Sequence, residues 1–112
     1  MNIEQHSIKF DNWLGNWMYR DLHRPNPSWS PTQVDRQARW VLEEFIKRNP
    51  EWWVEMAYDA QSDFPWLVWL RPLDGVEKEY APLSSGYSLP LMICKVVALA
   101  VTNGDIVDDD LY

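Results

Sequence analysis

The sequence predicts a single α+β domain, in which an antiparallel meander sheet of three to four strands packs against two to three helices. Three patterns predict this sandwich-like α-β-β-β-α core: a helical apolar period over residues 31–48, strand-like alternation over residues 51–60, and a nearly uniform apolar run over residues 89–102. The chain has 112 residues, which is close to the commonest size of one domain. We expect this domain to span residues 1–103 and an acidic tail to span residues 104–112.

Apolar residues spaced among polar ones predict a short amphipathic first helix over residues 3–14. Gly15 and Asn16 follow, and we expect them to end the helix. Residues 17–19 then predict a short strand or an extended entry to a loop. Two prolines lie within residues 20–30, and this segment is expected to be irregular.

A capping pattern predicts the start of the second helix. Ser30 can accept a hydrogen bond from the Gln33 backbone N–H, and the Gln33 side chain can reach back to Ser30. Pro31 suits the first helical position, where its missing N–H costs nothing. The predicted helix runs to Arg48 before an Asn-Pro stop. Its buried stripe is expected to consist of Val34, Ala38, Val41, Leu42, Phe45 and Ile46.

Three strands are predicted between the second helix and the last one. Residues 51–60 alternate with period two, and residues 66–71 form a strongly apolar run typical of a central strand. Asp74 and Gly75 match a two-residue hairpin turn, so residues 76–81 are expected to return as the third strand. Because short loops join these strands, neighbours in the sequence should pair antiparallel.

A loop is expected over residues 82–88, and Ser88 is placed to cap the last helix. This helix should run over residues 89–102 and be mostly buried, because it is apolar almost all round. Asn103 and Gly104 can form its left-handed end.

The acidic composition limits the classes of partner. The net charge is −7, and four acids lie in the last eight residues. An acidic body argues against general binding to nucleic acid or anionic membranes, where a basic face is expected. One cysteine, Cys94, allows no internal disulfide and favours a reducing cytoplasm, and its apolar neighbours predict burial. The N-terminus lacks a signal-peptide pattern, and no apolar run is long enough to span a bilayer.

The sequence offers no pattern typical of catalysis. The two histidines and the cysteine lack a zinc-ligand spacing, and the four glycines are scattered rather than gathered in a phosphate-binding loop. No serine or cysteine is placed to complete a nucleophilic triad. We therefore expect no enzyme activity, no cofactor and no metal.

The best candidate for a ligand site is the segment 19–39, which concentrates positive charge in an acidic chain. Arginine supplies bidentate contacts to phosphate, a tryptophan can stack on a base, and a helix N-terminus favours an anion. The predicted ligand-binding residues are Arg20, Arg24, Trp29, Arg36 and Arg39. In the purely structural alternative, the arginines pair with Asp21, Asp35 and Glu43, while Trp29 packs against the helix.

Eight tryptophans in one small domain must be shared between the core and the surface. Trp40 lies beside the predicted buried stripe of its helix rather than within it. Trp53 points to the opposite face of its strand from Trp52. We therefore predict that Trp40 and Trp53 are interface anchors and that the chain forms a homo-oligomer.

Two segments resemble the phage ABA-sandwich domain family. Residues 29–32 (W-S-P-T), leading into residues 39–43 (R-W-V-L-E), are similar to the W-S-P-S helix start of that family and the helix that follows it. Residues 89–100 are similar to its closing helix. The order of elements agrees over residues 10–102, although Met92 stands where the family tends to have alanine.

The resemblance implies a small phage or prophage protein, and the family has no established activity from which catalytic residues could be carried over. Because small phage proteins often blunt host immune signalling, the first hypothesis is a non-enzymatic protein that sequesters a nucleotide-like anionic signal. The second is a direct inhibitor that binds a host defence protein through its acidic surface, and the third is a structural or accessory phage protein. Each hypothesis places the protein in the cytoplasm of a host cell, with no direct nucleic-acid or membrane binding.

Overall fold

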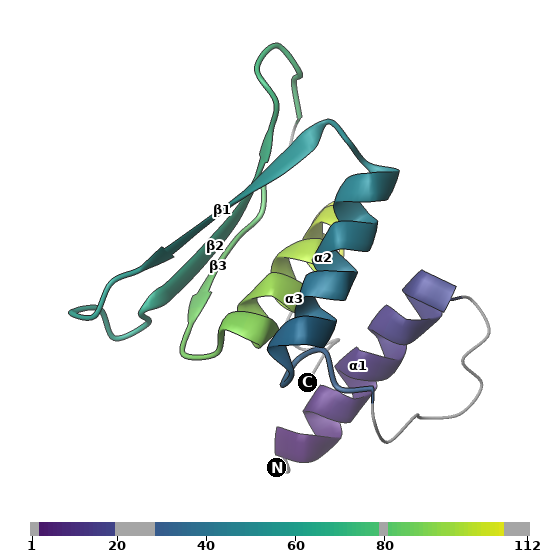
Figure 1. The fold of residues 1–112 in the computed structure, drawn as a ribbon, viewed down its shortest axis with the longest axis vertical. Coiled ribbons are helices and arrows are strands. Elements are labelled where there is room, and N and C mark those ends of the chain that lie inside the picture. Colours follow the sequence, from purple (N-terminus) through teal and green to yellow (C-terminus); the bar gives the residue numbers. More distant parts are fainter. Residues whose placement is uncertain (1–2, 20–28, 79–80, 107–112) are drawn as a thin grey trace.

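The computed structural model describes residues 3–19, 29–78 and 81–106, and it confirms the predicted α+β class (Figure 1). Three helices and a three-stranded antiparallel sheet follow one another in α-α-β-β-β-α order. The elements are α1 (Ile3–Tyr19), α2 (Asp35–Arg48), β1 (Trp52–Tyr58), β2 (Trp66–Pro72), β3 (Leu83–Gly86) and α3 (Leu89–Val101).

The sheet is a meander in the order β1-β2-β3, and its register determines which side chains face the helices. Trp52 lies opposite Pro72 and Val54 lies opposite Leu70, on the face that packs against the helices. Because successive residues of a strand point to opposite faces, Trp53 lies on the other face, as predicted.

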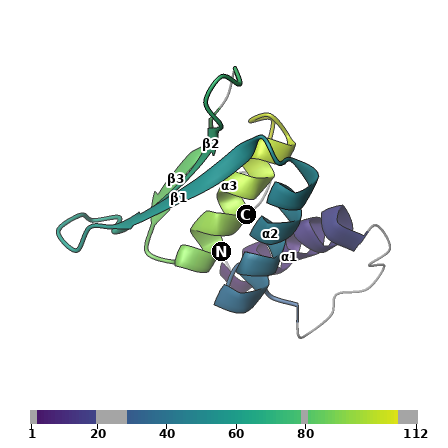
Figure 2. The ribbon, with the colours of Figure 1, turned by 45° about the horizontal axis from the view of Figure 1, so that its top comes forward.

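All three helices lie on one side of the sheet (Figures 1 and 2). The helix α3 contacts β2 and β3 on one side and α2 on the other, and α1 lies outside α2. Six residues of α3 are buried, which confirms the expectation for this helix: Met92, Ile93, Cys94, Val96, Val97 and Ala98. A fully buried large aliphatic side chain contributes roughly 1.5–3 kcal/mol, so α3 is the centre of the core.

The first helix is longer than predicted. It continues through Gly15 to Tyr19, so the short strand expected at residues 17–19 is wrong. Arg48 of α2 explains the extension, because its guanidinium donates to the backbone carbonyls of Trp17 and Met18 at 3.0 and 2.9 Å. These carbonyls lie in the last turn of α1 and have no partner within their own helix.

The second helix begins at Asp35 rather than directly after Ser30, and residues 31–33 form a separate turn. The Ser30 carbonyl accepts hydrogen bonds from the backbone N–H groups of Gln33 and Val34, both at 2.9 Å. The side chain that reaches back to the Ser30 N–H is that of Gln37, one turn later than predicted. The predicted stripe is buried at Ala38, Val41, Leu42 and Phe45, whereas Ile46 is half-buried and Val34 is exposed.

The third strand lies later in the chain than predicted. Asp74 and Gly75 form the expected turn, with Gly75 at φ 84°, but the described residues that follow, 76–78, are not a strand. The strand β3 falls instead within the expected loop. Gly86 of β3 packs closely under α3, because a Cβ there would lie 2.8 Å from Met92 Cε and this side chain would have to shift.

Both ends of α3 agree with the prediction. The Ser88 hydroxyl accepts a hydrogen bond from the Leu91 N–H at 3.3 Å, and Asn103 and Gly104 adopt the left-handed conformation. Ile106 still packs against the core, so the described chain remains attached beyond the predicted domain end at residue 103. The acids of residues 108–110 lie outside the described residues. Among the residues described, no helix has both the length and the apolar character that crossing a membrane requires.

Replacing Arg48 tests whether its guanidinium holds the end of α1. We expect Arg48→Met to lower the free energy of unfolding by about 1 kcal/mol, because two terminal carbonyls lose a charged donor that lies near the surface. Urea denaturation measures this loss, and hydrogen exchange should quicken in the last turn of α1. Arg39→Met is the matched control, since Arg39 is exposed on the same helix. Equal losses in the two variants would contradict the role of Arg48.

Candidate functional site: a groove between α1 and α2

Trp29 serves as a structural contact in this fold. Its ring packs against the core, and its indole N–H donates to the backbone carbonyl of Asp11 at 2.8 Å. This contact agrees with the alternative in which Trp29 packs within the fold, and not with the prediction that its ring stacks on a nucleotide base. Arg20 and Arg24, two further residues of the predicted ligand site, lie outside the described residues.

Asp11 joins α1 to the turn before α2. Its carboxylate accepts a hydrogen bond from the Thr32 N–H at 2.9 Å, and both residues are buried. Burial raises the pKa of the Asp11 carboxyl above its ordinary value of 3.8, and the Thr32 backbone hydrogen bond opposes part of that rise. The turn that was predicted as the first part of α2 is therefore held by a buried carboxylate.

The two described arginines of the predicted site are both exposed, and they have different surroundings. The Arg36 guanidinium lies 5.2 Å from the centroid of the Trp40 ring, within range of a cation–π contact. Arg39 forms no ion pair in the part of the chain that the structure describes. The predicted pairings of Arg36 and Arg39 with Asp35 and Glu43 are not formed.

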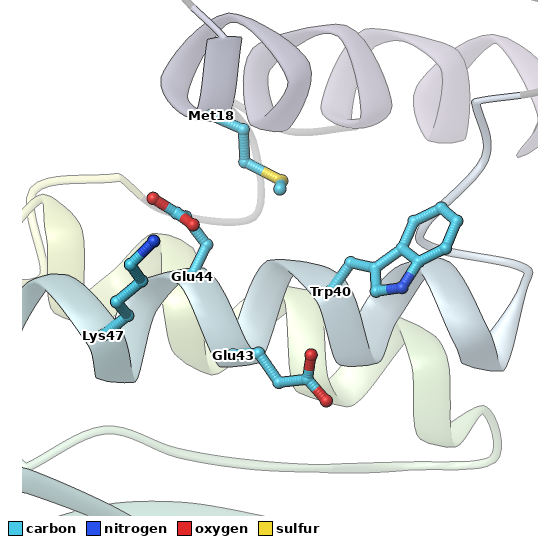
Figure 3. Close-up of a pocket in the computed structure, with 5 residues that line it drawn as sticks. All are labelled: Met18, Trp40, Glu43, Glu44 and Lys47. Atoms are coloured by element: carbon cyan, nitrogen blue, oxygen red, sulfur yellow. The ribbon is translucent and has the colours of Figure 1, made fainter.

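Trp40 borders an open groove of about 420 Å³ between the end of α1 and the outer face of α2 (Figure 3). The other lining residues are Met18, Glu43, Glu44 and Lys47. Met18 comes from the last turn of α1, and Figure 3 shows its side chain directed toward α2. Trp40 is 43% exposed, and its role as an interface anchor stays a prediction.

The charges around the groove are unequally neutralised. Arg48 bonds to Glu44 at 2.8 Å, so this carboxylate already has a cationic partner. Glu43 has no hydrogen bond or ion pair with any described residue, and neither has Lys47. The groove therefore presents an aromatic ring, a thioether, one uncommitted carboxylate and one uncommitted ammonium.

A second cleft, of about 380 Å³, gathers cations and aromatic rings at the C-terminal end of α2. Arg48 lies 4.5 Å from the Trp17 ring centroid, and Lys78 lies 5.6 Å from that of Trp52. Both cations are already paired, because Arg48 bonds to Glu44 and Lys78 bonds to Glu51 at 3.1 Å. All three helices end beside this cleft, and helix C-termini disfavour an anion. The cleft is therefore a poor site for a phosphate group.

The described residues offer no centre for metal or thiol chemistry. They contain no group of three His, Cys, Asp or Glu side chains that could hold a metal ion. Cys94 is fully buried, as predicted, and burial raises the pKa of its thiol well above the ordinary value. A thiol in this environment is a poor nucleophile.

Sequence reasoning identified Trp40 but missed the residues that complete the groove. Glu43, Glu44 and Lys47 follow Trp40 at helical spacings of three, four and seven, which places them on its side of α2. That spacing was available in the sequence. Met18 could not be found in this way, because it was expected in a strand.

Comparisons with known proteins found no match: no family model, no curated protein and no solved structure is similar to this chain.

The pH dependence of stability tests the buried Asp11 carboxylate. A raised pKa means that the folded protein binds this proton more tightly than the unfolded chain does, so Asp11 costs stability as the pH rises from about 3.8 through the folded pKa. Asp11→Asn keeps an acceptor for Thr32 and cannot ionise. We therefore expect the variant to gain stability relative to the parent as the pH rises over this window. Urea midpoints of both proteins measure it, and a relative loss would contradict the pKa direction.

Proposed function

We propose that this chain is a non-enzymatic protein-binding protein that receives an arginine side chain of a basic partner protein in the α1–α2 groove. One observation carries the proposal. An exposed tryptophan, Trp40, lies one helical turn before the uncommitted carboxylate of Glu43 in an open groove of about 420 Å³.

The ring and the carboxylate both border the groove, and each is a kind of group that binds a guanidinium. Arginine stacks on aromatic faces and forms bidentate bonds to carboxylates, whereas an ammonium is a compact and more strongly hydrated charge. The Arg36 guanidinium already lies 5.2 Å from the Trp40 ring centroid, so an incoming arginine competes with Arg36 for this ring. Met18 offers an adaptable apolar contact for the stem of an incoming side chain.

The charge of the whole chain supports a basic partner. A net charge of −7 attracts basic proteins over distances of about a Debye length and speeds their association. Lys47 opposes binding locally, because it places one positive charge in the groove. The resemblance to phage ABA-sandwich domains supplies the biological role of the proposal: the basic partner is a host defence protein, which this chain inhibits by binding.

Arginine peptides test the groove without a known partner. A blocked Gly-Arg-Gly peptide should bind with a Kd in the millimolar range, because one side chain makes all the contacts. Glu43→Gln should weaken binding and Lys47→Gln should tighten it, each about threefold to fivefold, since a screened surface charge contributes up to about 1 kcal/mol. Two-dimensional NMR titration measures all three affinities.

Matched controls separate the groove from general attraction. The same peptide with lysine keeps the charge but lacks the planar guanidinium, so it should bind more weakly. Trp40→Ala should abolish binding, whereas Trp53→Ala should leave it unchanged, because Trp53 is similarly exposed at 46% but lies on the sheet. Equal binding by the two tryptophan variants, or tighter binding after the loss of Glu43, would sink the proposal.

A nucleotide-like anion is the second candidate. The observation in its favour is that Arg36 and Arg39 are exposed on α2 and form no ion pair with a described carboxylate. The contacts of Trp29 weigh against it, because the stacking residue of the predicted site is packed against the core. Calorimetry with a panel of cyclic nucleotides and ADP-ribose tests it. Heat that disappears in an Arg36→Ala/Arg39→Ala variant would favour this candidate over protein binding, and the absence of heat from the whole panel would eliminate it.

A further inference from the structure

The face of the sheet that points away from the helices is apolar and uncovered by any described element (Figures 1 and 2). The register places side chains from all three strands on this face: Trp53, Glu55, Ala57, Leu67, Trp69, Arg71, Leu83 and Ser85. We call these eight residues the open face. Trp53 and Leu83 are 46% and 49% exposed, and Trp69 and Leu67 are half-buried.

The open face is electrically neutral in a strongly acidic protein. It carries one cation and one anion, and these pair with each other, since Arg71 Nε lies 2.8 Å from Glu55 Oε2. The Arg71 guanidinium also lies 5.7 Å from the Trp69 ring centroid. Burying an unpaired charge is usually costly, but covering this face leaves no charge without a partner. A strongly basic or acidic partner would find no opposite charge here.

A second copy of the chain meets both requirements, because its own open face is apolar and neutral. Two copies related by a two-fold axis present the same patch to each other, so the fit needs only one self-complementary surface. The two sheets would pack about 10 Å apart, as in a β-sandwich. The helices do not obstruct this approach, because they all lie on the other side of the sheet.

The size of the face sets the strength of the contact. The strands lie about 4.8 Å apart, and β1 and β2 have seven residues each whereas β3 has four. They define a flat area of roughly 280 Å². Upright tryptophan side chains add to this area, and two such faces together bury about 1,000 Å², which is near the lower limit for a specific interface. The expected dimer is therefore weak, with a Kd of about 10–100 μM.

We propose that the open face is a homodimer interface, in which Trp53 is the anchor of each copy. This surface is separate from the α1–α2 groove, so both grooves stay accessible in the dimer. The two linked grooves of a dimer can then bind two arginines of one partner. This raises the overall affinity, although each groove makes the same contacts as in the monomer.

Sedimentation velocity over about 5 μM to 1 mM protein, a range that brackets the expected Kd, tests the proposal. The mass should rise from one 13.3 kDa chain toward two and should stop there, because an interface with two-fold symmetry closes on itself. Trp53→Ala should raise the Kd at least about tenfold. Trp40→Ala, the control with similar exposure, should dimerise like the parent.

Charge variants keep the test independent of Trp53. Arg71→Glu leaves two carboxylates on each open face and should abolish the dimer, whereas the swapped variant Glu55→Arg/Arg71→Glu restores the pair and should dimerise again. Circular dichroism checks that each variant is folded. A monomer at every concentration, a mass that rises beyond two chains, or a dimer that depends on Trp40 instead of Trp53 would overturn the proposal.

Discussion

The burial of α3 is the constraint on which the rest of the structure depends. This helix is apolar almost all round, so it must be covered on every side. The sheet covers one side and α2 covers the other, and together they bury six of its residues. One face of the sheet packs against α3, and no described helix remains to cover the other face. An exposed apolar sheet face is therefore a consequence of how the core is built.

The fully buried side chains of Phe10 and Leu14 pack α1 into this core, and polar contacts fix its position at two points. Near its middle, the buried carboxylate of Asp11 holds the Thr32 backbone, and the Asp11 carbonyl accepts the indole N–H of Trp29. At its end, Arg48 binds two terminal carbonyls and stacks on Trp17. The position of α1 determines where Met18 lies, and so these contacts form one wall of the groove beside Trp40.

Patterns of local periodicity predicted the helices, the meander and the burial of Cys94, because each depends on residues close together in the sequence. The failures all involve long-range contacts. Gly15 signals a helix end, but Arg48, far along the chain, supplies the donors that let the helix continue. The third strand was expected at residues 76–81, yet β3 forms at Leu83–Gly86, where Ser84 and Gly86 lie close to Met92 of α3. The sequence likewise offered Trp40 and Trp53 as anchors but could not pair Trp40 with Met18, or show that Glu55 and Arg71 neutralise each other.

The central claim is that the two exposed tryptophans serve different partners: Trp40 an arginine of another protein and Trp53 a second copy of the chain. Fluorine NMR of protein labelled with 5-fluorotryptophan tests it most directly, with the two resonances assigned through Trp40→Phe and Trp53→Phe. Raising the protein concentration should shift the Trp53 resonance and leave Trp40 unchanged, and adding the arginine peptide to dilute protein should do the reverse. If both resonances respond together to either change, the two surfaces are not separate and the claim is wrong.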